Sequence, residues 1–222
     1  MLYITDSKMN SRALEQHHVL TSMLEPAFGI PTDVTFEIMG FTNMNNYNDS
    51  KSKEIKLGEV SGHKVILALL SPVFKRGFFG PAADKKDVIA VRETTLEAFK
   101  IMNDYIYNKC IDWSKLSVLE LYDIVNLAEK YDIPGLMKDV KTQMEKFPLT
   151  IKEVVDVYKT ASQFSQFPDV SDPLLLKCTN FLQENLRSTR ELLEFAAKHS
   201  GSGQEEMALK MIVPFVIEHK EM

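Results

Sequence analysis

The side chains that most often perform catalysis or bind metal ions are sparse and scattered in this sequence. Its five histidines fall in four segments, and no pair has cysteine or carboxylate neighbours at metal-ligand spacing. His17 and His18 are adjacent, so on a helix their rings point about 100° apart and cannot share one ion. The sequence has neither a glycine-rich phosphate cradle nor a Gly-x-Ser-x-Gly nucleophile elbow. We therefore expect no metal, no cofactor and no enzymatic activity.

The two cysteines, Cys110 and Cys178, have no histidine nearby in the sequence, and we interpret both as small buried hydrophobic residues. The N-terminus lacks the basic-then-apolar order of a secretory signal. Together with the low number of cysteines, this predicts a protein of the cytosol or nucleus in which both thiols are reduced. The longest apolar stretch, residues 65–70, is too short to cross a bilayer. The net charge of −5 disfavours a broad phosphate-binding face. Neither a membrane nor a nucleic acid is an expected partner.

One short stretch bounded by glycines is unusually rich in large apolar residues: Val73, Phe74, Phe78 and Phe79 fall within seven positions. On a helix Phe74 and Phe78 lie one turn apart on the same face. Two interpretations stay open. Both phenylalanines belong to the core, as is usual for such residues, or some are exposed and mark a groove for a partner.

Hydrophobic periodicity predicts a mixed N-terminal domain. Residues 10–24 have the apolar stripe of an amphipathic helix, and residues 33–38 alternate as a half-buried strand does, with Val34, Phe36 and Ile38 on one face. The further expected features are a polar loop at 42–53, a partner strand near 54–60, a helix ending near 70, a new helix opened by Ser71-Pro72, and a strand at 87–91.

Four Ser/Thr-x-x-Glu patterns predict helix starts, at 94–97, 117–120, 150–153 and 188–191. From Thr150 onward the period is helical, and Asp172-Pro173 is expected to open a further helix. Phe147-Pro148 is the natural boundary between the mixed domain and this helical tail, and a short flexible break at 200–203 precedes a last apolar segment, 211–217. The expected organisation is an N-terminal helical segment at 1–25, a domain core at 26–147 and a helical region at 148–222.

The order of these blocks resembles a BTB/POZ domain over residues 10 to about 146. The blocks that carry the resemblance are the N-terminal helix, the alternating strand, Gly62-His63-Lys64-Val65-Ile66-Leu67-Ala68, Ser71-Pro72-Val73-Phe74, Ala98-Phe99, Tyr105-Ile106-Tyr107 and Ala128-Glu129-Lys130-Tyr131. The tail from Thr150 is similar to the beginning of the helical BACK region. The resemblance implies an α+β fold, with a small sheet flanked by helices, followed by an all-helical C-terminal region.

The resemblance also implies a homodimer formed mainly through the N-terminal helix. Ala13, Leu20 and Leu24 supply the apolar face of that helix, which a lone helix does not keep in water. Asp33 and Lys64 match the family positions that pair in a pocket beneath the dimer interface. A partly buried carboxylate and ammonium each need a counter-charge, so their pairing is physically reasonable.

Many relatives of this kind bind cullin-3, which implies a second surface. It comprises Phe78 and Phe79, the loop after them, Tyr122, and the tail helix around Val154 and Tyr158. The loop often carries a hydrophobic-x-Glu triplet, and here the matching residues are Ala82, Ala83 and Asp84. The anchor is reduced to a methyl group and the acid is one methylene shorter, which predicts weaker cullin binding at about 0.8 kcal/mol for each lost methylene.

These observations leave three hypotheses from different classes. The first is a homodimeric adaptor that recruits an unknown protein substrate to a cullin-3 ubiquitin ligase. The second is a BTB scaffold or transcriptional co-regulator that does not bind a cullin. The third is an enzyme with an unrecognised site. It is disfavoured because the sequence shows no group of acid, base and nucleophile. A zinc-finger transcription factor is disfavoured because no finger of Cys2His2 spacing is present.

Overall fold

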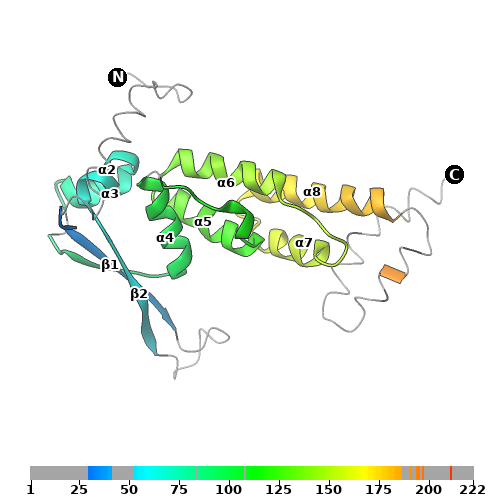
Figure 1. The fold of residues 1–222 in the computed structure, drawn as a ribbon, viewed down its shortest axis with the longest axis horizontal. Helices are drawn as coiled ribbons and strands as arrows, with labels where there is room; N and C mark the ends of the chain where they lie inside the picture. Colours follow the sequence, from blue (N-terminus) through cyan, green and yellow to red (C-terminus); the bar gives the residue numbers. More distant parts are fainter. Residues whose placement is uncertain are drawn as a thin grey trace, which may run out of the picture. The chain divides into compact units, whose positions relative to one another are not determined.

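The computed structural model describes residues 30–41, 53–83, 85–107, 109–186, 191, 194–195, 197 and 211. The expected helix at 10–24 lies outside this part, as do residues 42–52 of the loop expected at 42–53 and most of the 188–222 segment. The elements are β1 Val34–Phe41, β2 Glu54–Gly62, α2 Lys64–Leu70, α3 Pro72–Phe79, β3 Val88–Val91, α4 Leu96–Ile106, η2 Trp113–Lys115, α5 Val118–Lys130, α6 Pro134–Lys146, α7 Val154–Gln163 and α8 Pro168–Asn185 (Figure 1).

The chain divides into two compact units. Unit 1 contains Met1–Ser114 and Asp123–Met137, and unit 2 contains Lys115–Tyr122 and Lys138–Met222. Unit 1 holds the whole sheet, whereas the described elements of unit 2 are helical. The expected α+β fold with a helical C-terminal region is therefore confirmed. The expected domain boundaries at 25 and 147 stay predictions.

A three-stranded sheet with the order β2-β1-β3 organises unit 1. β1 runs antiparallel to β2 and parallel to β3, and its register shifts between Ile38 and Met39. The predicted alternation is confirmed, because Val34, Phe36 and Ile38 are all at most 2% exposed. The opposite face carries Thr35 and the Glu37 carboxylate, which is half-buried. Central β1 thus supplies one face of the core, and β2 and β3 are the two edges of the sheet.

Four aromatic rings from four different elements close the core of unit 1. The Phe36 ring of β1 lies 5.0 Å from Phe99 of α4 and 5.5 Å from Phe74 of α3, measured between ring centroids. Tyr131, which follows α5, stacks on Phe74 at 4.4 Å and meets Phe99 edge-on at 6.1 Å. Offset and edge-on contacts of this kind are favourable because of the ring quadrupoles. The circuit joins the sheet to three helical segments.

Capping side chains set the starts of several helices. The predicted start at Ser71-Pro72 is confirmed: the Ser71 hydroxyl accepts from the Phe74 N–H at 3.1 Å, and proline occupies the first turn of α3. At α5, Ser117 and Glu120 exchange backbone and side-chain bonds of 2.8 and 3.3 Å as a reciprocal capping box. The Ser117 hydroxyl also donates to the Glu120 carboxylate at 2.7 Å, and this bond, together with the one from the Ser117 backbone N–H, lowers the pKa of the Glu120 carboxyl.

Three predicted helix starts need correction. The cap of α4 is Thr95, whose hydroxyl accepts from the Ala98 N–H, and not Thr94 one residue earlier. Residues 151–153 form turns, so α7 begins at Val154 although Thr150 does bond to Glu153. The helix expected to open at Asp172-Pro173 is already under way, because α8 begins at Pro168 and contains Pro173. At α4 and at α8 a second signal lies nearby, Thr95 beside Thr94 and Pro168 before Pro173.

α7 and α8 pack on each other as a helical hairpin in unit 2 (Figure 1). The packed side chains include Val154, Val155 and Ala161 of α7, none of which is exposed. Leu174 and Cys178 of α8 are buried with them. Cys178 is thus a small hydrophobic residue as predicted, whereas Cys110 is exposed and the prediction for it is wrong. Cys110 follows α4 in a segment without regular structure, which leaves the thiol in solvent.

None of the helices in the described part of the chain is both long and apolar enough to span a bilayer.

Candidate interaction surfaces

The start of α2 brings together the two charged residues that were predicted to pair. The Asp33 carboxylate accepts a hydrogen bond from the backbone N–H of Lys64 at 2.7 Å. The Lys64 ammonium lies 2.7 Å from the carboxylate of Asp87, and its side chain is 18% exposed. Asp33 therefore meets Lys64 through the main chain, while Asp87 supplies the counter-charge. A place for Asp33 and Lys64 in a dimer interface stays a prediction.

His63, the residue before α2, is buried in a polar network beside these charges. The Tyr107 hydroxyl lies 2.7 Å from the imidazole Nδ1 and accepts from the His63 backbone N–H at 2.8 Å. Nε2 lies 3.3 Å from the Ile30 carbonyl oxygen. Burial raises the pKa of Tyr107. The network ties residue 30 to α2 and α4.

α2 presents two apolar side chains to solvent. Val65 is 54% exposed and Leu69 55%, and they lie four residues apart on one helical face. The opposite residues, Ile66 and Leu67, are buried. The sequence showed only a continuous apolar run here, so the exposed pair was missed. The other predicted dimer residues, Ala13, Leu20 and Leu24, lie outside the described residues.

The three phenylalanines of α3 differ in how much of each side chain is buried. Phe74 is 5% exposed, Phe78 is half-buried and stacked on Phe74 at 5.5 Å, and Phe79 is 60% exposed. Phe74 therefore belongs to the core and Phe79 does not, while a groove for a partner at Phe79 stays a prediction. Ala82 is exposed in the loop that follows, and Asp84 lies outside the described residues. Gly80 is required here, because a Cβ at this position would lie 2.4 Å from the Arg76 carbonyl oxygen.

The three residues predicted from unit 2 differ in depth as well. Tyr122 and Val154 are fully buried, and only Tyr158 is part-exposed. The Tyr122 ring stacks on Phe164 at 4.2 Å, and its hydroxyl bonds to Ser171 at 2.9 Å. Tyr122 and Val154 therefore support the α7–α8 hairpin and offer no free surface. A contribution of these two residues to cullin binding stays a prediction, and it would act through the fold of unit 2.

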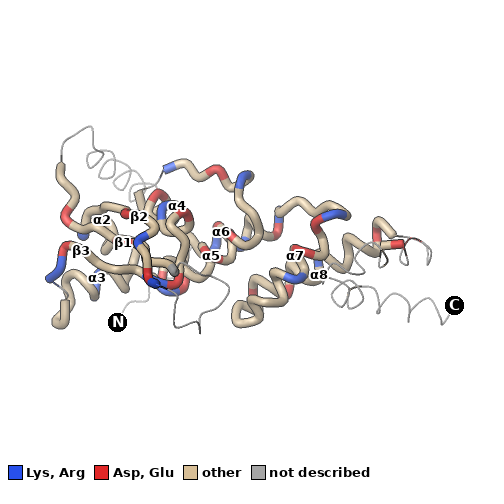
Figure 2. The backbone as a smooth tube through the Cα atoms, turned by 90° about the horizontal axis from the view of Figure 1, so that it is seen from below, with Lys and Arg blue, Asp and Glu red and all other residues tan. Residues whose placement is uncertain are grey.

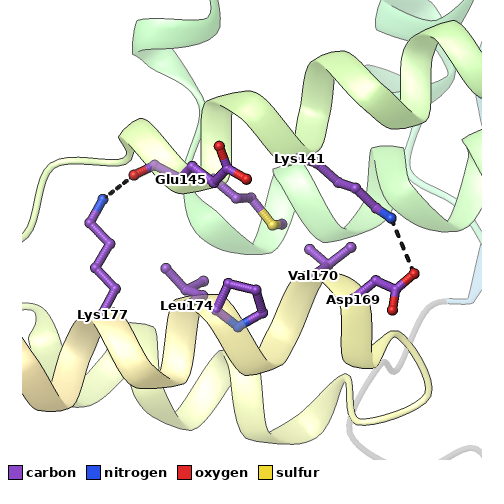
Figure 3. Close-up of a pocket in the computed structure, with 8 residues that line it drawn as sticks. Lys141, Glu145, Asp169, Val170, Leu174 and Lys177 are labelled. Carbon is purple, nitrogen blue, oxygen red and sulfur yellow. Dashed lines mark hydrogen bonds and ion pairs between the residues drawn. The ribbon is translucent and has the colours of Figure 1, made fainter.

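Unit 2 has a small hollow between α6 and α8, of about 230 Å³ (Figure 3). Its apolar lining includes Met144, Val170 and Leu174, and a lysine stands at each end. Lys141 pairs with Asp169 at 3.5 Å. Lys177 donates to the carbonyl oxygens of Glu145 and Phe147, both at 2.6 Å, and burial lowers its pKa. Both ammonium groups are thus engaged in holding the two helices together.

Among the described residues no group of three or more His, Cys, Asp or Glu side chains is placed to hold a metal ion. The features that the structure does place on the surface are apolar side chains on α2 and α3 and charged side chains around them. Figure 2 shows basic and acidic positions interspersed along the chain.

Comparisons with known proteins identify the domain. Residues 54–148 match the family model of the BTB/POZ domain. The chain is 40% identical over 78 residues to BTB/POZ domain-containing protein 3 of Homo sapiens and of Mus musculus, a match that covers 35% of this chain and 14% of each relative. It is 38% identical over 81 residues to BTB/POZ domain-containing protein 6 of Xenopus laevis, covering 36% and 15%.

The chain therefore contains a BTB/POZ domain, as the sequence predicted. β1 precedes the matched segment, yet it pairs with both other strands and places Phe36 in the core. The chain spans only 14–15% of the length of the relatives it matches. BTB/POZ domains are protein-interaction modules that commonly dimerise, and proteins that contain them are generally not enzymes. The presence of this domain suggests a protein-interaction adaptor.

Proposed function

We propose that this chain is a homodimeric adaptor of the cytosol or nucleus that recruits a protein substrate to a cullin-3 ubiquitin ligase. In this proposal residues 1–25 form the dimerisation segment, residues 26–147 the BTB/POZ core and residues 148–222 a BACK-like region. The observation that carries it is the exposed Phe79 at the end of α3, directly before an exposed loop, in a BTB/POZ domain. The dimer and the cullin contact rest on separate surfaces and are tested separately.

The dimer is supported by the uncovered face of α2. Val65 and Leu69 each leave more than half of their surface in water, and both follow Lys64 at the start of the helix. Adjacent apolar side chains of this kind are usually covered by a partner, because burial gains about 25 cal/mol for each Å² of apolar surface removed from water. A second copy of the chain, with the stripe of Ala13, Leu20 and Leu24, supplies such a cover.

Analytical ultracentrifugation tests the dimer. We expect twice the 25.3 kDa mass of one chain at micromolar concentrations. The double variant Val65→Ser/Leu69→Ser should shift the equilibrium toward one chain. The matched control is Leu119→Ser/Leu176→Ser, which removes two leucines of similar exposure, 53% and 61%, from unit 2. A single-chain mass for the natural protein at every concentration would refute the dimer.

The cullin contact is supported by the geometry of the α3 end. Phe79 projects into solvent, and the following loop exposes Ala82 instead of a larger apolar anchor. Restoring the anchor and the longer acid with Ala82→Leu/Asp84→Glu should therefore tighten binding. The gain is at most about 2 kcal/mol, the value of burying one leucine side chain before ordering costs are subtracted.

Calorimetry against the N-terminal region of cullin-3 compares three proteins. We expect weak binding by the natural chain, tighter binding by the double variant, and loss of binding with Phe79→Ala. Circular dichroism should show the same fold for all three, since Phe79 and Ala82 are exposed. If neither the natural chain nor the restored variant binds, the ligase adaptor is rejected.

The second candidate, a BTB scaffold or transcriptional co-regulator, is favoured by one specific observation. The loop position that would anchor a cullin is Ala82, a residue with a single methyl group. A dimer that binds other proteins without a cullin needs no such anchor. Affinity purification from cells with the natural chain and with Phe79→Ala separates the two functions. Partners retained by both, with no cullin among them, would establish the scaffold.

A further inference from the structure

The outer face of α3 combines an exposed aromatic ring with unpaired positive charge. Lys75 and Arg76 are exposed one turn before Phe79, at the i−4 and i−3 positions, so all three side chains lie on one side of the helix. The opposite side is occupied by buried Phe74 and half-buried Phe78. This face is therefore fixed in orientation, because the aromatic core of unit 1 holds the inner side of the helix.

The local charge opposes that of the whole chain. Residues 75–86 contain four cations, Lys75, Arg76, Lys85 and Lys86, against one carboxylate, Asp84, while the chain carries a net charge of −5. Lys75, Arg76 and Lys85 make no ion pair within the described part of the chain. Other cations of unit 1 do form ion pairs, as Lys56 does with Glu37 and Arg92 with Glu54. Figure 2 shows the blue positions on α3 and on the stretch leading into β3.

We propose that this α3 face, comprising Lys75, Arg76 and Phe79, binds an acidic segment of a partner protein that carries an apolar side chain next to its carboxylates. The exposed ring supplies the apolar contact, and the cations select for negative charge around it. The inference rests on the proposed role of the chain as an interaction adaptor. It concerns the chemistry of the partner and does not require that partner to be a cullin.

Electrostatics would act here mainly on selection and on the association rate. Exposed charge pairs contribute little individually and are screened over about 8 Å at physiological salt. Several unpaired cations around one apolar anchor still discriminate against basic or neutral segments and accelerate encounter with acidic ones. The ring provides the contact that persists in salt. Binding should therefore weaken with salt without disappearing.

Fluorescence anisotropy tests the proposal with the full chain and labelled synthetic peptides. The probes are a peptide of leucine and glutamate, the same peptide with glutamine for glutamate, and the same peptide with lysine for glutamate. We expect the acidic peptide to bind best. The double variant Lys75→Gln/Arg76→Gln should bind it about fivefold more weakly, which is the loss expected from removing two exposed charge pairs. Phe79→Ala should weaken both the acidic and the glutamine peptide about tenfold.

The matched control is Lys146→Gln/Lys152→Gln, which removes two exposed cations from unit 2 and changes the net charge equally. An equal loss in this control, or equal binding of the acidic and glutamine peptides, overturns the proposal. Tighter binding of a single-stranded RNA than of the acidic peptide also overturns it, because the face would then recognise phosphate. Ala82→Leu/Asp84→Glu should leave peptide binding unchanged, so failure of the cullin contact remains distinguishable from failure of this inference.

Discussion

Unit 1 and unit 2 are held together by different kinds of contact. In unit 1 the four rings of Phe36, Phe74, Phe99 and Tyr131 touch in a closed circuit. In unit 2 the buried polar chain runs from the Tyr122 hydroxyl to Ser171, whose own hydroxyl donates to the Phe164 carbonyl at 2.8 Å. Unit 2 has the ring pair of Tyr122 and Phe164 but adds to it side chains that bond to the ends of helices.

The difference follows from what each unit has to bury. A sheet offers a broad apolar face, and large rings cover it because they bury much area with little conformational entropy lost. A helical hairpin ends in carbonyl groups that lack partners within their own helix. Ser171 meets the carbonyl of Phe164, the cap of α7, and Lys177 meets those at the end of α6. The stability of unit 1 should therefore be sensitive to a loss of buried side-chain volume, and the stability of unit 2 to a loss of hydrogen bonds.

The largest expected effect is the loss of one ring from the circuit. Phe36→Ala should lower the free energy of unfolding by about 3 to 5 kcal/mol, the usual cost of a buried Phe→Ala change. Urea unfolding followed by the fluorescence of Trp113, the only tryptophan and a residue of unit 1, measures it. Phe79→Ala is the control, since a ring that is 60% exposed should cost little. Equal losses would show that the circuit does not determine the stability of unit 1.

Alkaline pH should destabilise the two units over different ranges. Burial raises the pKa of Cys178 in unit 2 from 9.0 to about 12, and that of Tyr131 in unit 1 from 10.0 to about 12. Each group has a higher pKa in the folded chain than in the unfolded chain. Its contribution to the free energy of unfolding is therefore fully present below the unfolded pKa and is lost as the pH rises toward the folded pKa. The loss is about 1.4 kcal/mol for each pH unit inside the window.

Unit 2 should therefore begin to weaken near pH 9 and unit 1 near pH 10. Urea midpoints from Trp113 fluorescence and from circular dichroism, taken between neutral pH and about 11, follow the two units. Cys178→Ala should remove the earlier loss, and Tyr131→Phe the later one. A pH profile that neither variant changes would contradict this assignment.

A smaller effect is expected from the polar chain of unit 2. Tyr122→Phe keeps the stacking on Phe164 and removes the hydroxyl that bonds to Ser171, so it should cost about 1 kcal/mol. Ser171→Ala should cost more, because it also leaves the Phe164 carbonyl without this donor. A double-mutant cycle monitored by circular dichroism gives the coupling energy of the pair. Strict additivity would show that the two hydroxyls do not interact.

The smallest effect concerns the end of α5. Asp132 has φ 53°, and the N–H groups of Asp132 and Ile133 bond back to Glu129 and Ala128 as in a Schellman motif. Glycine adopts this conformation without a side-chain penalty, so Asp132→Gly should stabilise by about 0.5 kcal/mol. Asp139→Gly, the same change inside α6, should instead destabilise by about 0.3 kcal/mol. Thermal unfolding compares them, and destabilisation by both would refute the strain at Asp132.

Local sequence patterns predicted the α+β class, the strands and the BTB/POZ domain. The alternation around Phe36 and the cap at Ser71 depend only on residues close in the chain, so they were visible without a structure. Helix starts were less certain where two signals compete. Pro168 and Pro173 each suit a first turn, and only the packing of α8 decides that the second lies inside the helix.

Side-chain depth and pairing were decided by the tertiary structure. The sequence identified Phe74, Phe78 and Phe79 as one apolar group, but the position of Phe36 and Tyr131 determines which ring is buried and which remains in water. In the same way the burial of Tyr122 and the bond of its hydroxyl to Ser171 of α8 could not be read from the sequence around it. Periodicity is a property of neighbours along the chain, whereas burial and charge pairing depend on elements that are distant in sequence and meet only in the fold.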